Sequence, residues 1–191
     1  MQKKVLVLLA DGFEEVEVIT PIDYLRRAGI SVTVAAINDN VTVKGSHGIQ
    51  VVADACLKST LKETWDGVVV PGGLPGADNI AASKDAGDFL TTMNAAGRLV
   101  CAICAAPARV LSPLGLLTGK KFTCYPGEEK KALSACPNTE WKQDRVVVDG
   151  NLITSRGAGT AGEFAFAIID SLLGDGEGKK ISDKVLAETR G

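Results

Sequence analysis

The stretch RLVCAICAAP, residues 98–107, organises the whole chain. It begins as a short apolar run, which is the pattern of a buried parallel strand. It then changes to small residues and a segment, residues 105–112, that is compatible with a helix. Cys104 lies where the strand becomes the helix. This pattern predicts a nucleophile elbow, a sharp strand–turn–helix that requires small residues two positions before and after the nucleophile, here Ala102 and Ala106.

Two interpretations of Cys104 are open from this stretch alone. A helix N-terminus behind the thiol favours the thiolate and hence reactivity, whereas many free cysteines are inert and pack as small hydrophobes. The pair Cys101 and Cys104 also matches a thioredoxin-like spacing. Along a strand, however, three residues at ~3.3 Å each separate the two Cα atoms by about 10 Å. A disulfide requires less than about 7 Å, so Cys101 is expected to be a core residue.

Composition indicates an ordinary globular protein. The chain has 191 residues, 46% apolar and 23% charged, which predicts a single domain over residues 1–191. A net charge of −2 argues against nucleic acid and anionic membrane surfaces as partners. Five cysteines without metal-ligand spacing argue for a reducing compartment and predict no metal site. The apolar run after Lys4 is too short for a signal peptide or a membrane span, so we expect a cytoplasmic protein.

Apolar runs and helix-compatible segments alternate along the chain. This alternation predicts an α/β fold, a doubly wound, mostly parallel sheet with helices on both faces, as in a flavodoxin-like sandwich. Pro21 is expected to kink or restart the first helix. Two hairpins are predicted, at 41–53 and 145–155. The expected central strands are 5–10, 31–37, 67–70 and 99–103, with a further strand at 121–124, and the expected helices are 14–28, 77–82, 84–96, 160–173 and 179–189.

Three features fall where central strands end. They are the acidic segment 11–17, the Pro-Gly-Gly turn at 71–73, and Cys104. Ligands bind outside the carboxyl ends of the strands in open α/β sheets. The sequence therefore predicts a functional site at this edge.

Glu17, Gly72-Gly73 and the elbow at 102–107 together resemble the ThiJ/PfpI superfamily. Within it, the likeness is greatest to the branch of the parkinsonism-associated protein deglycase, and it covers nearly the whole chain. Further matching segments are DGFEEVE at 11–17, RRAGI at 26–30, VPGG at 70–73 and TSRGAGT at 154–160. These motifs are specific in combination, although each alone is weak.

The resemblance implies that Cys104 is the nucleophile and an oxidisable thiol, with Glu17 as its carboxyl neighbour. Like charge and desolvation would push Glu17 toward its protonated form, so that it can donate to sulfur and shuttle a proton. The alternative for Glu17 is a solvated first-turn glutamate favoured by the helix dipole. The backbone N–H groups of Gly73 and Ala105 would form an oxyanion hole, although two glycines after a strand can also be a simple turn.

The resemblance also implies a substrate pocket, with departures from the family pattern. Many members carry a histidine where this chain has Tyr125, so a Cys–His–carboxylate triad is not expected. His47 takes the place of a pocket arginine, and its alternative is a free loop histidine. Arg27 resembles a residue that reaches the partner's pocket across a dimer interface, and its alternative is a helix C-terminal cation. Gly72 and Ala158 complete the expected pocket.

The family implies a cysteine-dependent glyoxalase or protein deglycase that needs no cofactor and acts as a homodimer. Its substrates would be small α-oxoaldehydes such as methylglyoxal, or their protein adducts. The second hypothesis is a non-catalytic redox sensor or chaperone of the oxidative stress response, in which Cys104 oxidises to a sulfinate. A cysteine peptidase or amidotransferase is disfavoured, because both usually need a histidine base and Tyr125 replaces the expected one.

Overall fold

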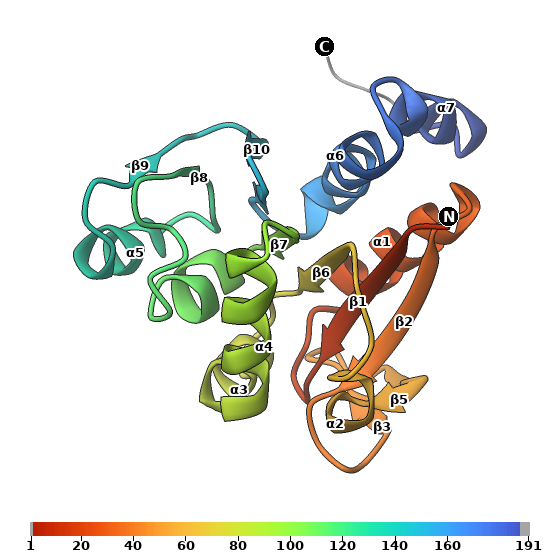
Figure 1. The fold of residues 1–191 in the computed structure, drawn as a ribbon, viewed down its shortest axis with the longest axis horizontal. Coiled ribbons are helices and arrows are strands. Elements are labelled where there is room, and N and C mark those ends of the chain that lie inside the picture. Colours follow the sequence, from red (N-terminus) through yellow and green to blue (C-terminus); the bar gives the residue numbers. More distant parts are fainter. Residues whose placement is uncertain (1, 188–191) are drawn as a thin grey trace.

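A computed structural model describes residues 2–187 of the chain. Its centre is a seven-stranded sheet in the order β10-β11-β7-β6-β1-β2-β5 (Figure 1). All neighbouring strands run parallel except β10, which is antiparallel to β11. The strands are β1 (Lys4–Leu9), β2 (Ser31–Ala36), β5 (Ala55–Cys56), β6 (Gly67–Val70), β7 (Leu99–Ile103), β10 (Val146–Asp149) and β11 (Leu152–Ser155).

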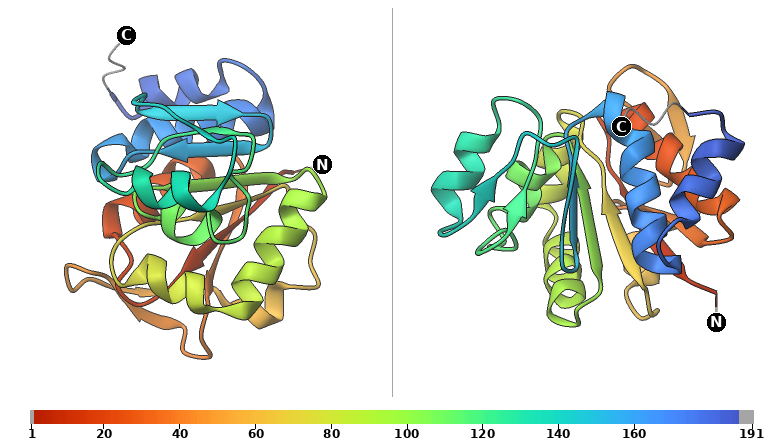
Figure 2. Two further views of the ribbon diagram at one scale, coloured as in Figure 1. Left: turned by 90° about the vertical axis from the view of Figure 1, so that its left-hand side faces the viewer. Right: turned by 90° about the horizontal axis from the view of Figure 1, so that it is seen from above.

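Helices cover both faces of this sheet, as the right-hand view of Figure 2 shows with the molecule seen from above. Side chains along β1 alternate between two buried clusters, because successive residues of a strand point to opposite faces. One cluster contains residues of α1 (Glu15–Arg27), α6 (Ala161–Leu173) and α7 (Glu177–Lys184). The other contains residues of α2 (Leu57–Thr60), α3 (Gly76–Ala82), α4 (Lys84–Ala95), the π-helix η1 (Pro107–Leu111) and α5 (Glu129–Ala135). The predicted doubly wound α/β fold is confirmed.

Two small sheets lie outside the central one. The predicted hairpin is formed by β3 (Thr42–Lys44) and β4 (Gln50–Val52), which pair antiparallel. The predicted strand at 121–124 is shorter than expected: β8 (Lys121–Phe122) pairs only with β9 (Glu140–Trp141). Neither β5 nor β9 was expected, because two-residue strands carry no period that a sequence pattern reveals.

The first helix differs from its prediction at Pro21. The expectation for Pro21 is a kink or a restart, but helix α1 continues through Pro21 to Arg27, so the restart is wrong. Val18 and Leu25, on either side of the proline, are buried in the same cluster. Their burial holds one continuous helix although Pro21 lacks the N–H group that an interior helical residue donates.

The segment after Cys104 is also shorter than predicted. The expected helix 105–112 is the π-helix η1, in which the Ser112 amide donates to the Pro107 carbonyl over 3.0 Å. Pro113 follows directly and cannot donate a backbone hydrogen bond.

The terminal helix α7 ends at Lys184 rather than Thr189, and positions 188 and 189 of the predicted helix lie outside the described residues. Within the described part of the chain, none of the helices combines the length and apolar character needed to span a bilayer.

Candidate active site

Cys104 lies directly after β7, at the carboxyl edge of the sheet. Its backbone φ is +65°, in the left-handed region that residues other than glycine rarely adopt. Holding this conformation costs roughly 1–3 kcal/mol, and such strain persists only where the surroundings impose it. The Cys104 amide donates to the Ser155 carbonyl over 3.0 Å, and its carbonyl accepts from the Tyr125 amide over 2.8 Å. These bonds to two neighbouring segments hold the predicted elbow in place.

Glu17 reaches this elbow from the first turns of α1. Its side chain is buried, with 1% of the residue exposed, so it is not a solvated surface glutamate. The Gly72 amide donates to Glu17 Oε2 over 2.9 Å. Among residues 2–187, Glu17 Oε1 has no hydrogen-bond partner. Burial leaves one carboxyl oxygen free to accept from, or donate to, a molecule bound at the thiol.

Gly72 packs against both the carboxyl and the thiol. A Cβ atom at position 72 would lie 2.6 Å from Cys104 Cβ and 2.7 Å from Glu17 Oε2. Both distances are far below van der Waals contact. The turn after β6 therefore needs glycine here so that the nucleophile and the carboxyl can meet.

Gly72→Ala is expected to lower the free energy of unfolding by roughly 1–3 kcal/mol, because the new methyl group has to push Cys104 and Glu17 apart. Urea denaturation measures this change. Gly159→Ala is the matched control, since a Cβ there meets nothing within 4 Å. Equal effects of the two substitutions would contradict the close packing at position 72.

The buried pair perturbs both of its titrating groups. Burial raises the pKa of Glu17 to about 7; the Glu14 charge adds to the rise, while hydrogen bonds with Cys104 and the Gly72 amide oppose it. Burial, the charge of Glu17 and a hydrogen bond with Glu17 raise the pKa of the Cys104 thiol. The net shift of the thiol pKa is therefore upward, opposite to the effect expected from a helix N-terminus, because burial and Glu17 outweigh the lowering by the backbone amides of Gly73 and Ala105.

The carboxyl and the thiol therefore titrate as a coupled pair. When Glu17 is ionised, its charge disfavours the thiolate; when Glu17 is protonated, that repulsion is absent and the carboxyl can donate to sulfur. The amides of Gly73 and Ala105 hydrogen-bond to the Cys104 sulfur and lower its pKa. Gly73 has φ +83°, and a Cβ there would lie 2.3 Å from the Glu14 nitrogen. The amides that were predicted to form an oxyanion hole therefore face the sulfur.

His47 lies apart from the thiol, in the loop between β3 and β4. Its side chain is 70% exposed, and its Nδ1 lies 3.0 Å from Glu15 Oε2 and 3.4 Å from Glu14 Oε2. A hydrogen bond with Glu15 and the charges of Glu14 and Glu15 raise the pKa of His47. Burial would raise the pKa of Glu15, but hydrogen bonds from the His47 ring and from backbone amides lower it to about 2. The histidine therefore ties its loop to the start of α1.

The same three side chains have donor atoms within 4.8 Å of one another, which is compatible with metal binding. A protonated His47 supplies positive charge between the two carboxylates without a metal ion.

Tyr125 and Ala158 line a pocket beside the buried pair. Two further pocket residues, Arg145 and Arg156, did not stand out in the sequence. The Tyr125 ring lies 3.4 Å from a Cβ built on Gly157, and that position is 3.9 Å from Glu17 Oε1. Tyr125 therefore lies near the buried carboxyl, and Ala158 lines the same pocket as Tyr125.

Arg27 does not approach the thiol within one chain. Its Nε donates to Asp23 Oδ2 over 2.6 Å on the exposed side of α1. It follows Glu17 by ten residues, or about 15 Å along a helix. A role in the pocket would require a second chain.

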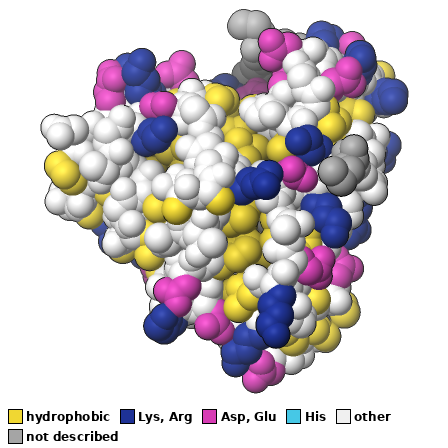
Figure 3. Space-filling view, in the orientation of Figure 1, with side chains coloured by type: hydrophobic (Ala, Val, Ile, Leu, Met, Phe, Trp, Pro, Cys, Tyr) yellow, Lys and Arg dark blue, Asp and Glu magenta, His cyan; other side chains and the backbone are white. Residues whose placement is uncertain are grey.

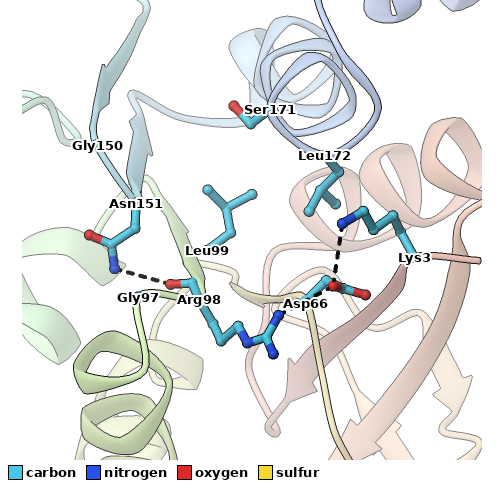
Figure 4. A pocket seen from close by; sticks show the side chains of 9 residues that line it. All are labelled: Lys3, Asp66, Gly97, Arg98, Leu99, Gly150, Asn151, Ser171 and Leu172. Carbon is cyan, nitrogen blue, oxygen red and sulfur yellow. Dashed lines mark hydrogen bonds and ion pairs between the residues drawn. The ribbon is translucent and has the colours of Figure 1, made fainter. Parts of the chain in front are cut away.

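A different pocket lies at the opposite edge of the sheet (Figure 4). There Lys3 Nζ and Arg98 Nη1 both lie 3.5 Å from Asp66 Oδ1. Its lining contains neither a thiol nor a histidine, and Asp66 forms ion pairs with both of its cations. The candidate active site is therefore the one at the Cys104 edge of the sheet.

Comparisons with known proteins agree with this geometry. Residues 3–171 match the model of the DJ-1/PfpI family. Protein dj-1beta of Drosophila melanogaster is 43% identical over 97% of this chain and 98% of its own. The glutathione-independent glyoxalase DJR-1.2 of Caenorhabditis elegans is 36% identical over 91% of this chain and 90% of its own. The crystal structure of Drosophila melanogaster DJ-1beta superposes with a TM-score of 0.93 at 42% identity, covering 99% of this chain and all of that one.

The match extends through the elbow, the glycine turn and the first helix, and it includes nearly the whole fold. On this ground the chain belongs to the DJ-1/PfpI family.

Proposed function

We propose that this protein is a cysteine-dependent glyoxalase that converts small α-oxoaldehydes such as methylglyoxal into 2-hydroxy acids without glutathione. The observation that carries the proposal is the contact between a thiol on a strained elbow and a buried carboxyl whose pKa is raised to about 7. A carboxyl that titrates near neutrality is suited to both accepting and returning a proton. The relationship to a nematode protein named glutathione-independent glyoxalase supports the same activity.

The first step joins the thiol to the aldehyde. Glu17 accepts the thiol proton, and the Cys104 sulfur forms a bond to the aldehyde carbon as the carbonyl π electrons move to oxygen. The amides of Gly73 and Ala105 stabilise the negative oxygen. Glu17 then returns the proton to that oxygen, which gives a neutral hemithioacetal.

The second step moves hydrogen between neighbouring carbons. Glu17 removes the proton from the former aldehyde carbon, and the electron pair shifts to the adjacent carbonyl, which gives an enediolate. Glu17 returns this proton to the second carbon, while the hydroxyl proton on the first carbon passes, through solvent, to the oxygen on the second carbon. The product is a thioester of the 2-hydroxy acid on Cys104. Water attacks the thioester carbon, the C–S bond breaks, and the acid and the free thiol are released. The overall reaction adds one water to methylglyoxal and yields lactate.

A protein deglycase would begin with the same thiol adduct, formed on the aldehyde-derived carbon of a glycated side chain. The two activities differ in the leaving group, so the proposal includes both. Incubation of the purified protein with methylglyoxal, without glutathione, tests it by enzymatic detection of lactate. A lack of lactate above the protein-free control would contradict the glyoxalase activity.

The second candidate is a redox sensor. The Gly73 and Ala105 amides and Glu17 would also hold the oxygens of a Cys104 sulfinate. One solved relative, from Toxoplasma gondii, is described as oxidised DJ-1; it has a TM-score of 0.93 at 38% identity and covers 98% of this chain and all of its own. Loss of lactate formation after peroxide treatment would indicate that Cys104 serves both as the nucleophile and as the oxidisable thiol.

His47→Ala is expected to retain methylglyoxal turnover within about tenfold of wild type, because its ring is bound to Glu15 rather than to the thiol. Removing a general acid–base group typically costs 10²–10⁴-fold. Steady-state lactate formation measures the difference, and Tyr125→Phe is the second variant of the series. A loss as large as that of a thiol variant, with an intact circular dichroism spectrum, would make His47 the base instead of Glu17.

The proposal includes a homodimer that uses α1. Val16 and Ile19 on this helix are 46% and 45% exposed, whereas Val18 and Ile22 are buried in the core. Exposed apolar side chains on one helix favour a two-fold contact, and a second copy would offer a place for Arg27.

Val16→Glu is therefore expected to shift the protein from dimer to monomer, because a buried unpaired carboxylate disfavours an apolar interface. Light scattering should show twice the chain mass for wild type and one chain mass for the variant. Leu133→Glu, at a residue that is 44% exposed on α5, is the matched control and should stay dimeric. A wild-type protein that is monomeric in solution would contradict the proposed dimer interface on α1.

The proposal also places the enzyme in a reducing compartment such as the cytoplasm. All five cysteines are free, including the half-buried Cys104. An oxidising environment would threaten the free thiol on which the chemistry depends.

A further inference from the structure

The pocket beside the reactive pair has a volume of about 420 Å³ and is lined by Tyr125, Pro126, Arg145 and Arg156 together with the segment 157–160. Gly157 separates it from Glu17, since a Cβ on this glycine would lie 3.9 Å from Glu17 Oε1. That oxygen has no partner within the described residues. Gly157 carries no side chain, so only its backbone lies between this carboxyl oxygen and the pocket.

The sheet register brings Arg156 close to the elbow. Ser155 pairs with Ile103 between parallel strands, and the Cys104 amide donates to the Ser155 carbonyl. Arg156 and Cys104 therefore follow corresponding positions on adjacent strands, which lie about 4.8 Å apart.

The two pocket arginines differ in whether a carboxylate pairs with the guanidinium. Arg145 has such a partner, because its Nε donates to Glu163 Oε2 over 2.6 Å. Its Nη2 also donates to the Gly159 carbonyl over 2.6 Å. Arg156 is half-buried and donates over 2.9 Å to the Gln143 carbonyl. Within residues 2–187 no carboxylate forms an ion pair with it, whereas Arg145 pairs with Glu163.

A guanidinium has five N–H donors in a planar fork that matches carboxylate and phosphate oxygens. Arg156 uses one of them on a neutral carbonyl, so the rest remain for an anion or for water. Figure 3 shows that Lys and Arg side chains alternate with Asp and Glu on one face of the molecule. Arg156 is thus a guanidinium without an acidic partner among residues 2–187, and its backbone lies one strand away from the elbow.

We propose that Arg156 binds an anionic group, a carboxylate or a phosphate, carried by the substrate on the side away from the aldehyde. The preferred substrates are then acidic α-oxoaldehydes or acidic adducts rather than neutral methylglyoxal. The substrate class rests on the proposed function, but the anion site can be tested on the thiol itself without turnover.

Alkylation of Cys104 by iodoacetate and by iodoacetamide is the test. The two reagents have the same size and leaving group, and differ in carrying a carboxylate or a neutral amide. In both reactions the sulfur forms a bond to carbon, iodide leaves, and the thiol proton passes to solvent. Peptide mass spectrometry gives the rate constant for each reagent, and their ratio reports anion recognition independently of thiol reactivity.

Arg156→Gln is expected to lower the ratio of the iodoacetate rate constant to the iodoacetamide rate constant by roughly five- to tenfold. Arg156→Lys is expected to lower this ratio by less, because lysine keeps the positive charge and loses only the planar fork of donors. Arg145→Gln is the matched control. It removes the same charge from the same pocket, yet should change the ratio by less than about twofold, because Glu163 already engages that guanidinium. An unchanged ratio in Arg156→Gln overturns the proposal. An equal fall of the ratio in Arg156→Gln and Arg145→Gln also overturns it, because the reagent would then respond only to the total positive charge of the pocket.

Wild-type protein provides a second measurement if Arg156→Gln fails to fold. Acetate and inorganic phosphate, compared with acetamide at constant ionic strength, should protect Cys104 from iodoacetate in a saturable way. The better protector identifies carboxylate or phosphate, and no protection by either overturns the anion site. A protein that shows the Arg156-dependent ratio but forms no lactate contradicts the proposed function alone.

Discussion

Cys104→Ser is expected to lower methylglyoxal turnover by roughly a thousandfold or more, which is the scale seen when a covalent nucleophile is removed. A serine hydroxyl is a far weaker nucleophile than a thiol at neutral pH, and Glu17, which contacts this position, has a pKa raised to about 7. The rate of lactate formation with purified variants measures this loss.

Cys56→Ser is the matched control, because Cys56 is also a half-buried free thiol but lies on β5, away from the elbow. It is expected to retain turnover within about twofold, as surface substitutions away from a site usually do. A Cys104→Ser variant that keeps more than a tenth of the activity would show that the hemithioacetal forms elsewhere or without the enzyme.

Glu17→Gln is expected to lower turnover by roughly 10²–10⁴-fold, because glutamine fills the same space but cannot carry a proton between carbon atoms. Glu14→Gln, at the start of the same helix, controls for the loss of one negative charge and should stay within about tenfold. Equal losses in the two variants would indicate that the acidic helix start matters only through its charge.

The same substitution is expected to raise stability at neutral and basic pH. The folded pKa of Glu17 is raised from 4.5 to about 7, so the fold favours the protonated form. The contribution of Glu17 to the free energy of unfolding is fully present below its unfolded pKa of 4.5. It is lost as the pH rises through the folded pKa of about 7. A shift of this size corresponds to about 3 kcal/mol lost between the two values.

Chemical denaturation at pH 5 and at pH 8 should therefore show Glu17→Gln gaining stability over wild type mainly at pH 8. Glu15 has its pKa lowered to about 2, so its contribution is lost only under more acidic conditions and cancels in this comparison. A stability difference that is the same at both pH values would contradict the raised pKa of Glu17.

The predictions for Cys104→Ser and Glu17→Gln depend on one balance between the stability of the fold and the chemistry of the site. The fold buries a carboxyl beside a thiol and places that thiol in a strained backbone conformation. Both features destabilise the folded state, and both supply what proton transfer and nucleophilic attack require. Glu17→Gln separates them, since it is expected to stabilise the protein and inactivate it.

The sequence by itself determined the parts of this protein that depend on local pattern. The period of apolar residues located the central strands and main helices, and their alternation implied the doubly wound sheet. Small residues around Cys104 indicated the elbow that its φ of +65° now shows. The alternation of strand side chains separated Cys101, which is fully buried, from Cys104.

Only the tertiary structure decided the electrostatics of the site. Glu17 and Gly72 are 55 positions apart in sequence, and nothing local to either shows that the carboxyl is buried against the thiol. The pairing of His47 with Glu15 across 32 positions, and the lack of an acidic partner for Arg156 among the described residues, are likewise properties of packing. Burial and charge act through space, so a pKa depends on neighbours that the fold brings together and that a pattern along the chain does not contain.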